Sequence, residues 1–334
     1  MQLLSSLARW YLVSGLLLLA TACSVGNAGD AEEGFRKFEN IYEPSGVQQL
    51  PDGRFIVVED ESSQPISLFT LGPDGDAEEQ ALWRRSLTGW LSSNRALGSL
   101  EDLEDISIDA DGRIYAITSH SRKSGGKRDD QREHIVRFGL HGADVVDMRI
   151  KRGLRKAIIQ SHDFLRDASK IRDVKGDEGF NIEGLSFDRD KRHLLIGLRA
   201  PLKDEHAVIV TLLNPQAMFD ADEEPRVDPE LQLLDLDQGG IRAMAWDEQL
   251  GGYLIVSRRP DKNFKLWLWD GHSGNAPTRL RAPELGKLRQ AEGVTPVVRD
   301  GRPLGVLIVS DEGNGLSGKP GRFVLIPYSE LTAE

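Results

Sequence analysis

The sequence contains a single cysteine in 334 residues, at position 23. An intramolecular disulfide is therefore impossible, and burial of apolar side chains has to stabilise the fold. Beyond the first 22 residues no apolar run approaches the roughly 20 residues that span a bilayer. Long basic tracts are also missing and the formal net charge is −11, so we expect no nucleic acid or other polyanion as a partner.

Two further absences bear on organisation and chemistry. No Pro/Ser-rich linker divides the chain after its N-terminal segment, which favours one large domain of about 300 residues. The seven histidines show no metal-binding spacing. Gly315-Leu316-Ser317-Gly318 lacks the spacing and the strand-to-helix turn of a nucleophile elbow, so this route to a serine hydrolase is not supported.

The first 22 residues differ from the rest. Arg9 precedes a mostly apolar run, Trp10–Thr21, and small residues lead directly to Cys23. A short apolar run that ends in small residues predicts a signal peptide, not a membrane span. The segment resembles a bacterial lipoprotein signal, which implies lipidation of Cys23. The alternative is an ordinary cleaved signal followed by an incidental cysteine.

Residues 23–36 are small, polar and acidic, as expected of a flexible tether. Cleavage after residue 22 removes one positive charge, that of Arg9, and changes the net charge from −11 to −12. Ser24 after the cysteine favours the outer membrane over the inner one. We therefore expect a monomeric, lipid-anchored envelope protein on the periplasmic side, with its folded domain at residues 37–334.

A short phrase occurs five times in this domain. Its fullest form, Asn181–Asp188, is an apolar alternation that begins with a carboxylate and ends in an acidic turn. The five copies centre on Ser45, Glu104, Glu183, Arg242 and Glu292. The intervals between these positions are 59, 79, 59 and 50 residues. Such intervals, with insertions of variable length, fit propeller blades better than helical repeats, whose periods are tighter.

The residues that follow each copy support this interpretation. Each copy leads through a turn rich in Asp or Gly into a second apolar strand, the pattern of a β-hairpin. Third strands follow, and weaker fourth strands occur in four units, the first at Leu82–Leu87. The fifth unit has only three strands, and Lys37–Tyr42 would supply the fourth and close the ring.

We therefore predict an all-β fold, a five-bladed β-propeller closed by its N-terminal strand. Six blades are the alternative, because the long second interval could hold another one. However, Leu154–Val174 has the periodicity of an amphipathic helix, which predicts a helical insertion. The insertions Arg122–Arg132 and Asn214–Glu230 are predicted to be recognition loops.

Alignment of the five copies places one side chain of each on the central axis. We name Ser45, Glu104, Glu183, Arg242 and Glu292 the inner ring. Three carboxylates crowded around an axis repel one another and need compensating charge. Calcium, which binds six to eight oxygens, is one solution, with Ser45, Glu104, Glu183 and Glu292 as ligands. The other solution is Arg242, whose guanidinium can bridge carboxylates without a metal.

The ends of the second strands align in the same way. We name Asp60, Ser119, Arg199, Arg258 and Asp311 the outer ring. Arg199 and Arg258, together with Arg242, would suit a clamp on a phosphate or carboxylate, with Asp60 and Asp311 beside the ligand. The alternative is that these charges are solvated or paired with one another.

The first-strand phrases around Ser45, Glu104, Glu183 and Glu292 resemble those of bacterial exported propellers, including a lipoprotein family of unknown function. Similar phrases occur in phytase-like esterase propellers and in calcium-activated apyrases. Resemblance to the apyrases implies a calcium-binding role for Ser45, Glu104, Glu183 and Glu292. Arg242 departs from this pattern, because a cation disfavours a metal ion beside it.

Two functions are expected from these features. The first is a phosphoester hydrolase or a binder of a small anionic phospho-ligand, with Glu183 or Glu104 orienting a water molecule. The second is a non-catalytic scaffold that binds an envelope protein or glycan through its loops.

Overall fold

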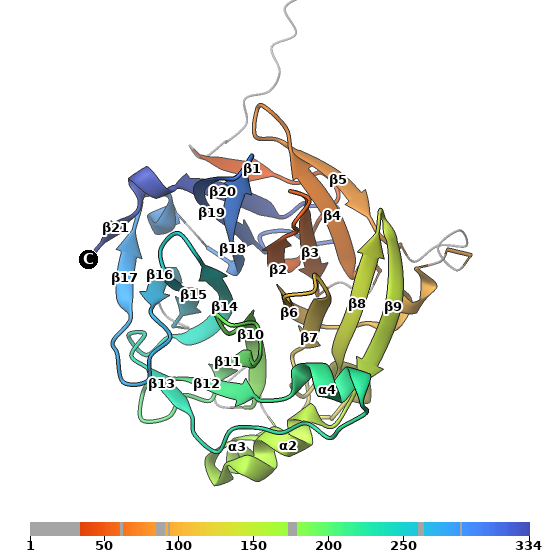
Figure 1. The fold of residues 1–334 in the computed structure, drawn as a ribbon, viewed down its shortest axis with the longest axis vertical. Coiled ribbons are helices and arrows are strands. Elements are labelled where there is room, and N and C mark those ends of the chain that lie inside the picture. Colours follow the sequence, from red (N-terminus) through yellow and green to blue (C-terminus); the bar gives the residue numbers. More distant parts are fainter. Residues whose placement is uncertain are drawn as a thin grey trace, which may run out of the picture. The chain divides into compact units, whose positions relative to one another are not determined.

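The structure, a computed structural model, describes residues 34–60, 63–84, 91–92, 94–172, 179–259, 264–287 and 289–334. The predicted signal peptide and Cys23 lie outside these residues. The described strands form five antiparallel sheets, which surround a common axis as the blades of a five-bladed β-propeller (Figure 1). The five-bladed prediction is confirmed, and no helix of the described residues is long and apolar enough to cross a membrane.

Each blade is given from its innermost strand outward. Blade 1 contains β2 (Pro44–Gln49), β3 (Phe55–Glu59), β4 (Ile66–Leu71) and β5 (Ala77–Ala81). Blade 2 contains β6 (Leu103–Ile108), β7 (Ile114–Thr118), β8 (Ile135–His141) and β9 (Asp144–Lys151). Blade 3 contains β10 (Asn181–Phe187), β11 (Leu194–Ala200), β12 (Ala207–Leu212) and β13 (Gln232–Leu234).

Both ends of the described chain take part in the last two blades. Blade 4 contains β14 (Gly240–Asp247), β15 (Gly252–Arg258), β16 (Phe264–Trp269), β17 (Thr278–Arg281) and β21 (Thr332–Ala333). Blade 5 contains β18 (Ala291–Arg299), β19 (Arg302–Ser310), β20 (Arg322–Pro327) and β1 (Phe35–Lys37). An N-terminal strand therefore completes the last blade, as predicted, and Phe35 pairs with Val324.

The predicted bounds of that strand, Lys37–Tyr42, are wrong at both ends: β1 begins at Phe35, within the predicted tether, and ends at Lys37. The chain leaves the sheet after Lys37 because the carboxylate of Glu79 accepts hydrogen bonds from the N–H groups of Glu39 at 2.6 Å and Asn40 at 2.7 Å. Phe38, which follows the strand, instead packs in the apolar layer between blades 1 and 5. The apolar pattern of this segment therefore reflects burial between blades and not strand pairing.

Apolar side chains fill each of the five interfaces between adjacent blades, which gives five apolar layers around the axis. Three α-helices extend the layer between blades 2 and 3: α2 (Leu154–Ser161), α3 (Asp163–Ala168) and α4 (Pro215–Asp220). The predicted helical insertion is thus present, but its continuous bounds are wrong. Extended backbone at His162 divides it into α2 and α3.

Two other local predictions differ from the structure. The fourth strand of blade 1 is β5, not Leu82–Leu87; Leu82 and Trp83 are buried against blade 2. The strand was missed because β5 reads Ala-Glu-Glu-Gln-Ala and has no residue with a buried side chain. The insertion Asn214–Glu230 contains α4, whose Met218 and Phe219 are buried.

Candidate functional site

A β-bulge places every inner-ring residue. In blade 3, Ile182 pairs with Leu198 and Gly184 with Gly197, so Glu183 has no partner in the ladder. The same one-residue shift occurs in every innermost strand, at Ser45, Glu104, Arg242 and Glu292. An unpaired bulge residue bends its strand and re-aims its side chain. The repeated phrase of the sequence is thus a repeated bulge, at the end of the axis where the innermost strands begin.

Arg242 is the cation of the inner ring. Its Nη1 lies 2.6 Å from Oε2 of Glu183, and its Nη2 donates to Oε1 of Glu292. The guanidinium is buried, which by itself would lower its pKa, but the two carboxylates more than offset this effect and raise it. Three blades are therefore joined across the axis by one arginine.

Glu183 is held by three side chains. In addition to Arg242, Nη1 of Arg199 lies 2.9 Å from its Oε1, and Nδ2 of Asn181 donates to the same oxygen at 3.0 Å. Arg199 remains 38% exposed at its side chain, whereas Glu183 is buried. This carboxylate therefore holds two arginine side chains in place.

Glu104 has a different environment. Among the described residues, no hydrogen bond or ion pair reaches its carboxyl group. Burial raises its pKa well above the usual range, and the charges of Glu183, Asp102, Asp60 and Glu292 raise it further. Glu104 is therefore the carboxyl group of the inner ring whose environment most opposes ionisation.

The strand register places the outer-ring residues at equivalent positions. In every blade, the residue before the inner-ring residue pairs with the residue before the outer-ring residue. Arg199 contacts Glu183, and the Ser119 hydroxyl donates to Asp102. Burial, followed by the charges of Glu43 and Asp60, raises the pKa of Asp311 to about 7. Within the described part of the chain, Arg258 makes no hydrogen bond or ion pair with the inner ring, and its guanidinium lies over Phe264, 5.0 Å from the ring centre.

The two rings are chemically divided between blades. All three of their arginines, Arg199, Arg242 and Arg258, come from blades 3 and 4. Blades 5, 1 and 2 supply Glu292, Asp311, Asp60 and Glu104 and no cation. Burial first, then neighbouring carboxylates, raises the pKa of Glu292 to about 7 although Arg242 opposes the shift. An arginine side of the rings thus faces a carboxyl side.

Asp102 lies beside the outer ring, where it accepts a hydrogen bond from Ser119, but it was not identified from the sequence. Its backbone is left-handed, with φ 63°, and Oδ1 lies 3.0 Å from Nη2 of Arg132. Burial and the charge of Asp60 raise its pKa to about 7. The acidic run Glu101–Asp105 was the available signal.

Asp105 was also missed, although it follows Glu104 directly. It stands where the other phrases have Gly46, Gly184, Ala243 and Gly293. A charged residue at a position that is otherwise Gly or Ala could have identified Asp105 from the sequence. Its buried carboxylate accepts hydrogen bonds from the N–H groups of Leu185 at 2.7 Å and Met244 at 3.3 Å. Asp105 therefore connects blade 2 to blades 3 and 4.

The predicted calcium ligands do not form an open cage. Arg242 lies between Glu183 and Glu292, and the Ser45 hydroxyl donates to the carbonyl of Glu43 at 3.4 Å. Within the described part of the chain, no group of three or more His, Cys, Asp or Glu side chains is arranged to hold a metal ion. The residues as placed therefore do not fit a calcium ion at the inner ring.

The sequence matches no protein-family model, and a search of curated proteins finds no match. Several solved propellers are similar in fold. A gluconolactonase from Xanthomonas campestris has 11% identity, with 90% of this chain and 86% of that chain covered and a TM-score of 0.40. A β-1,3-galactosidase of family GH43 has 12% identity, coverage of 86% and 90%, and a TM-score of 0.47.

The major allergen Mala s 1 of Malassezia sympodialis has 13% identity, coverage of 86% and 78%, and a TM-score of 0.41. These proteins differ in function, so the likeness concerns the fold alone. The fold implied by the resemblance to exported propellers is confirmed, whereas membership of that family stays a prediction. The function has to be argued from the site.

Proposed function

We propose that this propeller is a phosphoester hydrolase whose site lies at the two rings, with Glu104 as the proton donor. The observation that carries the proposal is the contrast between Glu104 and Glu183. Glu104 is unpaired among the described residues and its pKa is raised well above the usual range, whereas Glu183 is ion-paired with Arg199 and Arg242. Two carboxyl groups with opposite environments are the usual mark of separate acid and anchoring roles.

The arginine side would bind the phosphoryl group. Arg199 is partly exposed, Arg258 stands at the equivalent position of the next blade, and a guanidinium presents paired donors to phosphate oxygens. Glu183 then positions arginines and does not orient water, which changes the role expected for it from the sequence. Arg242 is already bound between Glu183 and Glu292, and it contributes charge at the base of the site.

The reaction follows from these positions. Water attacks phosphorus as the ester P–O bond breaks, and the leaving oxygen takes the proton of Glu104. The proton of the attacking water passes to a second carboxylate, for which Asp311 and Asp102, with pKa values of about 7, are suited. Transfer of this proton to Glu104 restores the starting state.

The test is a panel of phosphomonoesters, phosphodiesters and nucleoside triphosphates with wild type and Glu104→Gln. Loss of the proton donor should lower kcat by about 10²- to 10⁴-fold. The matched control is Asp111→Asn, an exposed change at the other end of β6. Absence of turnover by wild type, or equal rates for wild type and Glu104→Gln, would overturn the proposal.

Each assay is run with added Ca²⁺ and with chelator, which tests the calcium expected from the sequence. Activity and melting temperature that rise together with Ca²⁺ would support a metal-dependent enzyme. If neither changes, the arginine network alone compensates the carboxylates.

A non-catalytic scaffold is the second candidate, and the insertion Arg122–Arg132 favours it. This basic segment is fixed by its own ion pairs, Lys123 with Asp129 and Arg128 with Glu133 at 2.6 Å. An ordered loop binds a partner at lower entropic cost. Binding of an envelope protein or glycan that is lost in Arg128→Ala but kept in Glu104→Gln would support the scaffold.

We also propose that the chain is anchored by lipid at Cys23 on the periplasmic face of the envelope. The sequence before the cysteine supports this. Cys23→Ser should move the protein from the membrane fraction to the soluble periplasmic fraction. Unchanged membrane association would contradict the anchor.

A further inference from the structure

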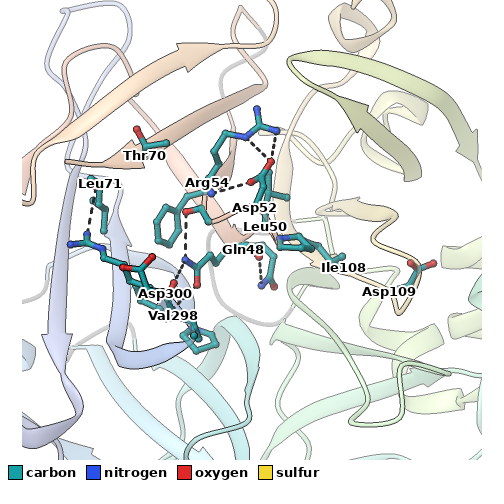
Figure 2. Close-up of a pocket in the computed structure, with 18 of the residues that line it drawn as sticks. Gln48, Leu50, Asp52, Arg54, Thr70, Leu71, Ile108, Asp109, Val298 and Asp300 are labelled. Carbon is teal, nitrogen blue, oxygen red and sulfur yellow. Dashed lines mark hydrogen bonds and ion pairs between the residues drawn. The ribbon is translucent and has the colours of Figure 1, made fainter. Parts of the chain in front are cut away.

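A cavity of about 870 Å³ lies at the opposite end of the axis from the two rings. Its walls are the last residues of β2, β6 and β18 with the hairpin turns that follow them, the end of β4 and Lys191 of the blade 3 turn (Figure 2). Cavities of about 300–1,000 Å³ hold small molecules, so its size suits a ligand. No role in the proposed hydrolysis falls to it.

The wall is balanced in charge. Its acidic side chains are Asp52, Asp109 and Asp300, and its basic ones are Arg54, Lys191 and Arg299. Apolar residues separate them, among them Ile108 and Val298, which is 45% exposed. A net charge of zero favours neither an anion nor a cation. Mixed polar and apolar walls suit a neutral ligand that carries several hydroxyl groups.

Several of these polar groups are already engaged. The side-chain amide of Gln49 donates to the carbonyl of Val298 at 2.8 Å and accepts from its N–H at 2.7 Å. Asp52 is paired with Arg54 at 2.6 Å, as Figure 2 shows. These contacts fix the wall that blades 1 and 5 form. The remaining wall, which contains Asp109 and Lys191, is left to bind a ligand.

Asp109 lines the remaining wall and has an acceptor without a partner. The residue is 5% exposed, and its Oδ1 accepts hydrogen bonds from the N–H groups of Asp111 at 3.0 Å and Arg113 at 2.9 Å. Its Oδ2 is buried and has no hydrogen-bond partner. Burial of an acceptor without a hydrogen bond destabilises the fold, and a hydrogen bond from a ligand hydroxyl would remove this cost.

Lys191 is the unusual residue of the opposing turn. Its φ is 59°, and it stands where the other four hairpins have glycines with positive φ, Gly53, Gly112, Gly251 and Gly301. Left-handed backbone costs a non-glycine residue about 1–2 kcal/mol. Its Nζ reaches blade 2 and donates to the carbonyl of Ile108 at 3.1 Å. The side chain of this lysine therefore links blade 3 to blade 2 at the cavity wall.

We propose that this cavity is a second ligand site, for a neutral sugar of one or two rings. Asp109 accepts hydrogen bonds from ring hydroxyls, Lys191 donates to them through its remaining hydrogens, and Val298 contacts the C–H face of the ring. The site is independent of the hydrolase proposal, because it lies at the other end of the innermost strands.

The experiment is titration calorimetry of the full chain with maltose. Glucose, glucuronate and glucosamine serve as single rings of the same shape with charges of zero, −1 and +1. We expect saturable 1:1 binding of maltose and weaker binding of both charged rings than of glucose. Absence of maltose binding, or preference for a charged ring, would overturn the inference.

Three variants assign the binding to this cavity. Asp109→Asn keeps the turn acceptor Oδ1 and should weaken maltose binding about tenfold or more, the effect of one hydrogen bond to a charged group. Val298→Trp fills the cavity from an exposed position and should abolish binding. Lys191→Gly restores the glycine of the other turns, so it should weaken binding without lowering the melting temperature.

The matched control is Asp111→Asn, an exposed change in the turn of Asp109. It should leave affinity unchanged. Equal affinity in wild type, Asp109→Asn and Val298→Trp would place the sugar elsewhere and contradict the proposal. The hydrolase assays are unaffected by this result, since Glu104→Gln alters the other end of the axis.

Discussion

The backbone N–H of Leu185 donates a hydrogen bond of 2.7 Å to the carboxylate of Asp105, which belongs to the neighbouring blade. The same oxygen accepts from Met244 of the blade beyond. The Asp105 side chain thus joins β6 to β10 and β14, which belong to different sheets and do not pair with one another.

Asp105→Ala should be strongly destabilising. It removes the acceptor of three buried N–H groups, those of Ile106, Leu185 and Met244, at about 1–3 kcal/mol each, so we expect a loss of at least about 3 kcal/mol in the free energy of unfolding. Urea unfolding measures the change. Asp111→Ala, exposed at the end of the same hairpin, should stay within about 0.5 kcal/mol of wild type. An equal effect of both changes would argue against the cross-blade role.

Glu183→Gln should also destabilise, by about 3–5 kcal/mol, because it removes the charge that pairs with buried Arg242 and with Arg199. The comparison is Glu104→Gln, which removes a carboxyl group that other carboxylates surround. At pH 8 this variant should unfold at a higher temperature than wild type. Identical shifts in the two variants would show that the inner ring does not separate their roles.

Stability should fall as pH rises from about 4 to 8. Asp102, Glu292 and Asp311 have native pKa values raised to about 7, above unfolded values of about 4. The native state therefore binds more protons in this range, and its stabilisation is present below the unfolded pKa values and is lost as pH rises through the native ones. Thermal unfolding from pH 4.5 to 9 tests this, and a constant or rising melting temperature would contradict it.

Gly46→Ala should cost about 1–3 kcal/mol through overpacking. A Cβ at this position would lie 2.7 Å from both Cα and Oδ1 of Asp105, where the innermost strands of blades 1 and 2 meet. Gly286→Ala, whose Cβ meets nothing within 4 Å, is the matched control and should be close to neutral. Denaturant unfolding of the pair distinguishes close packing from a general effect of glycine replacement.

The fold could be predicted because its signals are local. Each blade begins with a bulge phrase and turns at Asp or Gly, and both are readable in a short window, as at Asn181–Asp188. The outermost strand β5 could not be read in this way. It has no buried side chain, so its polar sequence carries no alternation, and only pairing with β4 makes it a strand.

The candidate site was accessible from the sequence only in part. Alignment places Glu183 and Arg242 on one ring, but it cannot say that the guanidinium joins Glu183 to Glu292 while Glu104 stays unpaired. That outcome depends on side-chain reach and burial across three blades. Asp102 enters the site through a left-handed backbone, which no spacing rule predicts.

The pairing of Phe35 with Val324 has a consequence for synthesis. The strand β1 is among the first described segments to leave the ribosome, but its partner β20 is among the last. Blade 5 therefore cannot form until translation is nearly complete, and closure has to bring together the two ends of the chain, a contact of very high sequence separation. Until then the open flanks of blades 1 and 4 expose apolar surface, so the nascent chain depends on rapid closure or on chaperones to avoid aggregation.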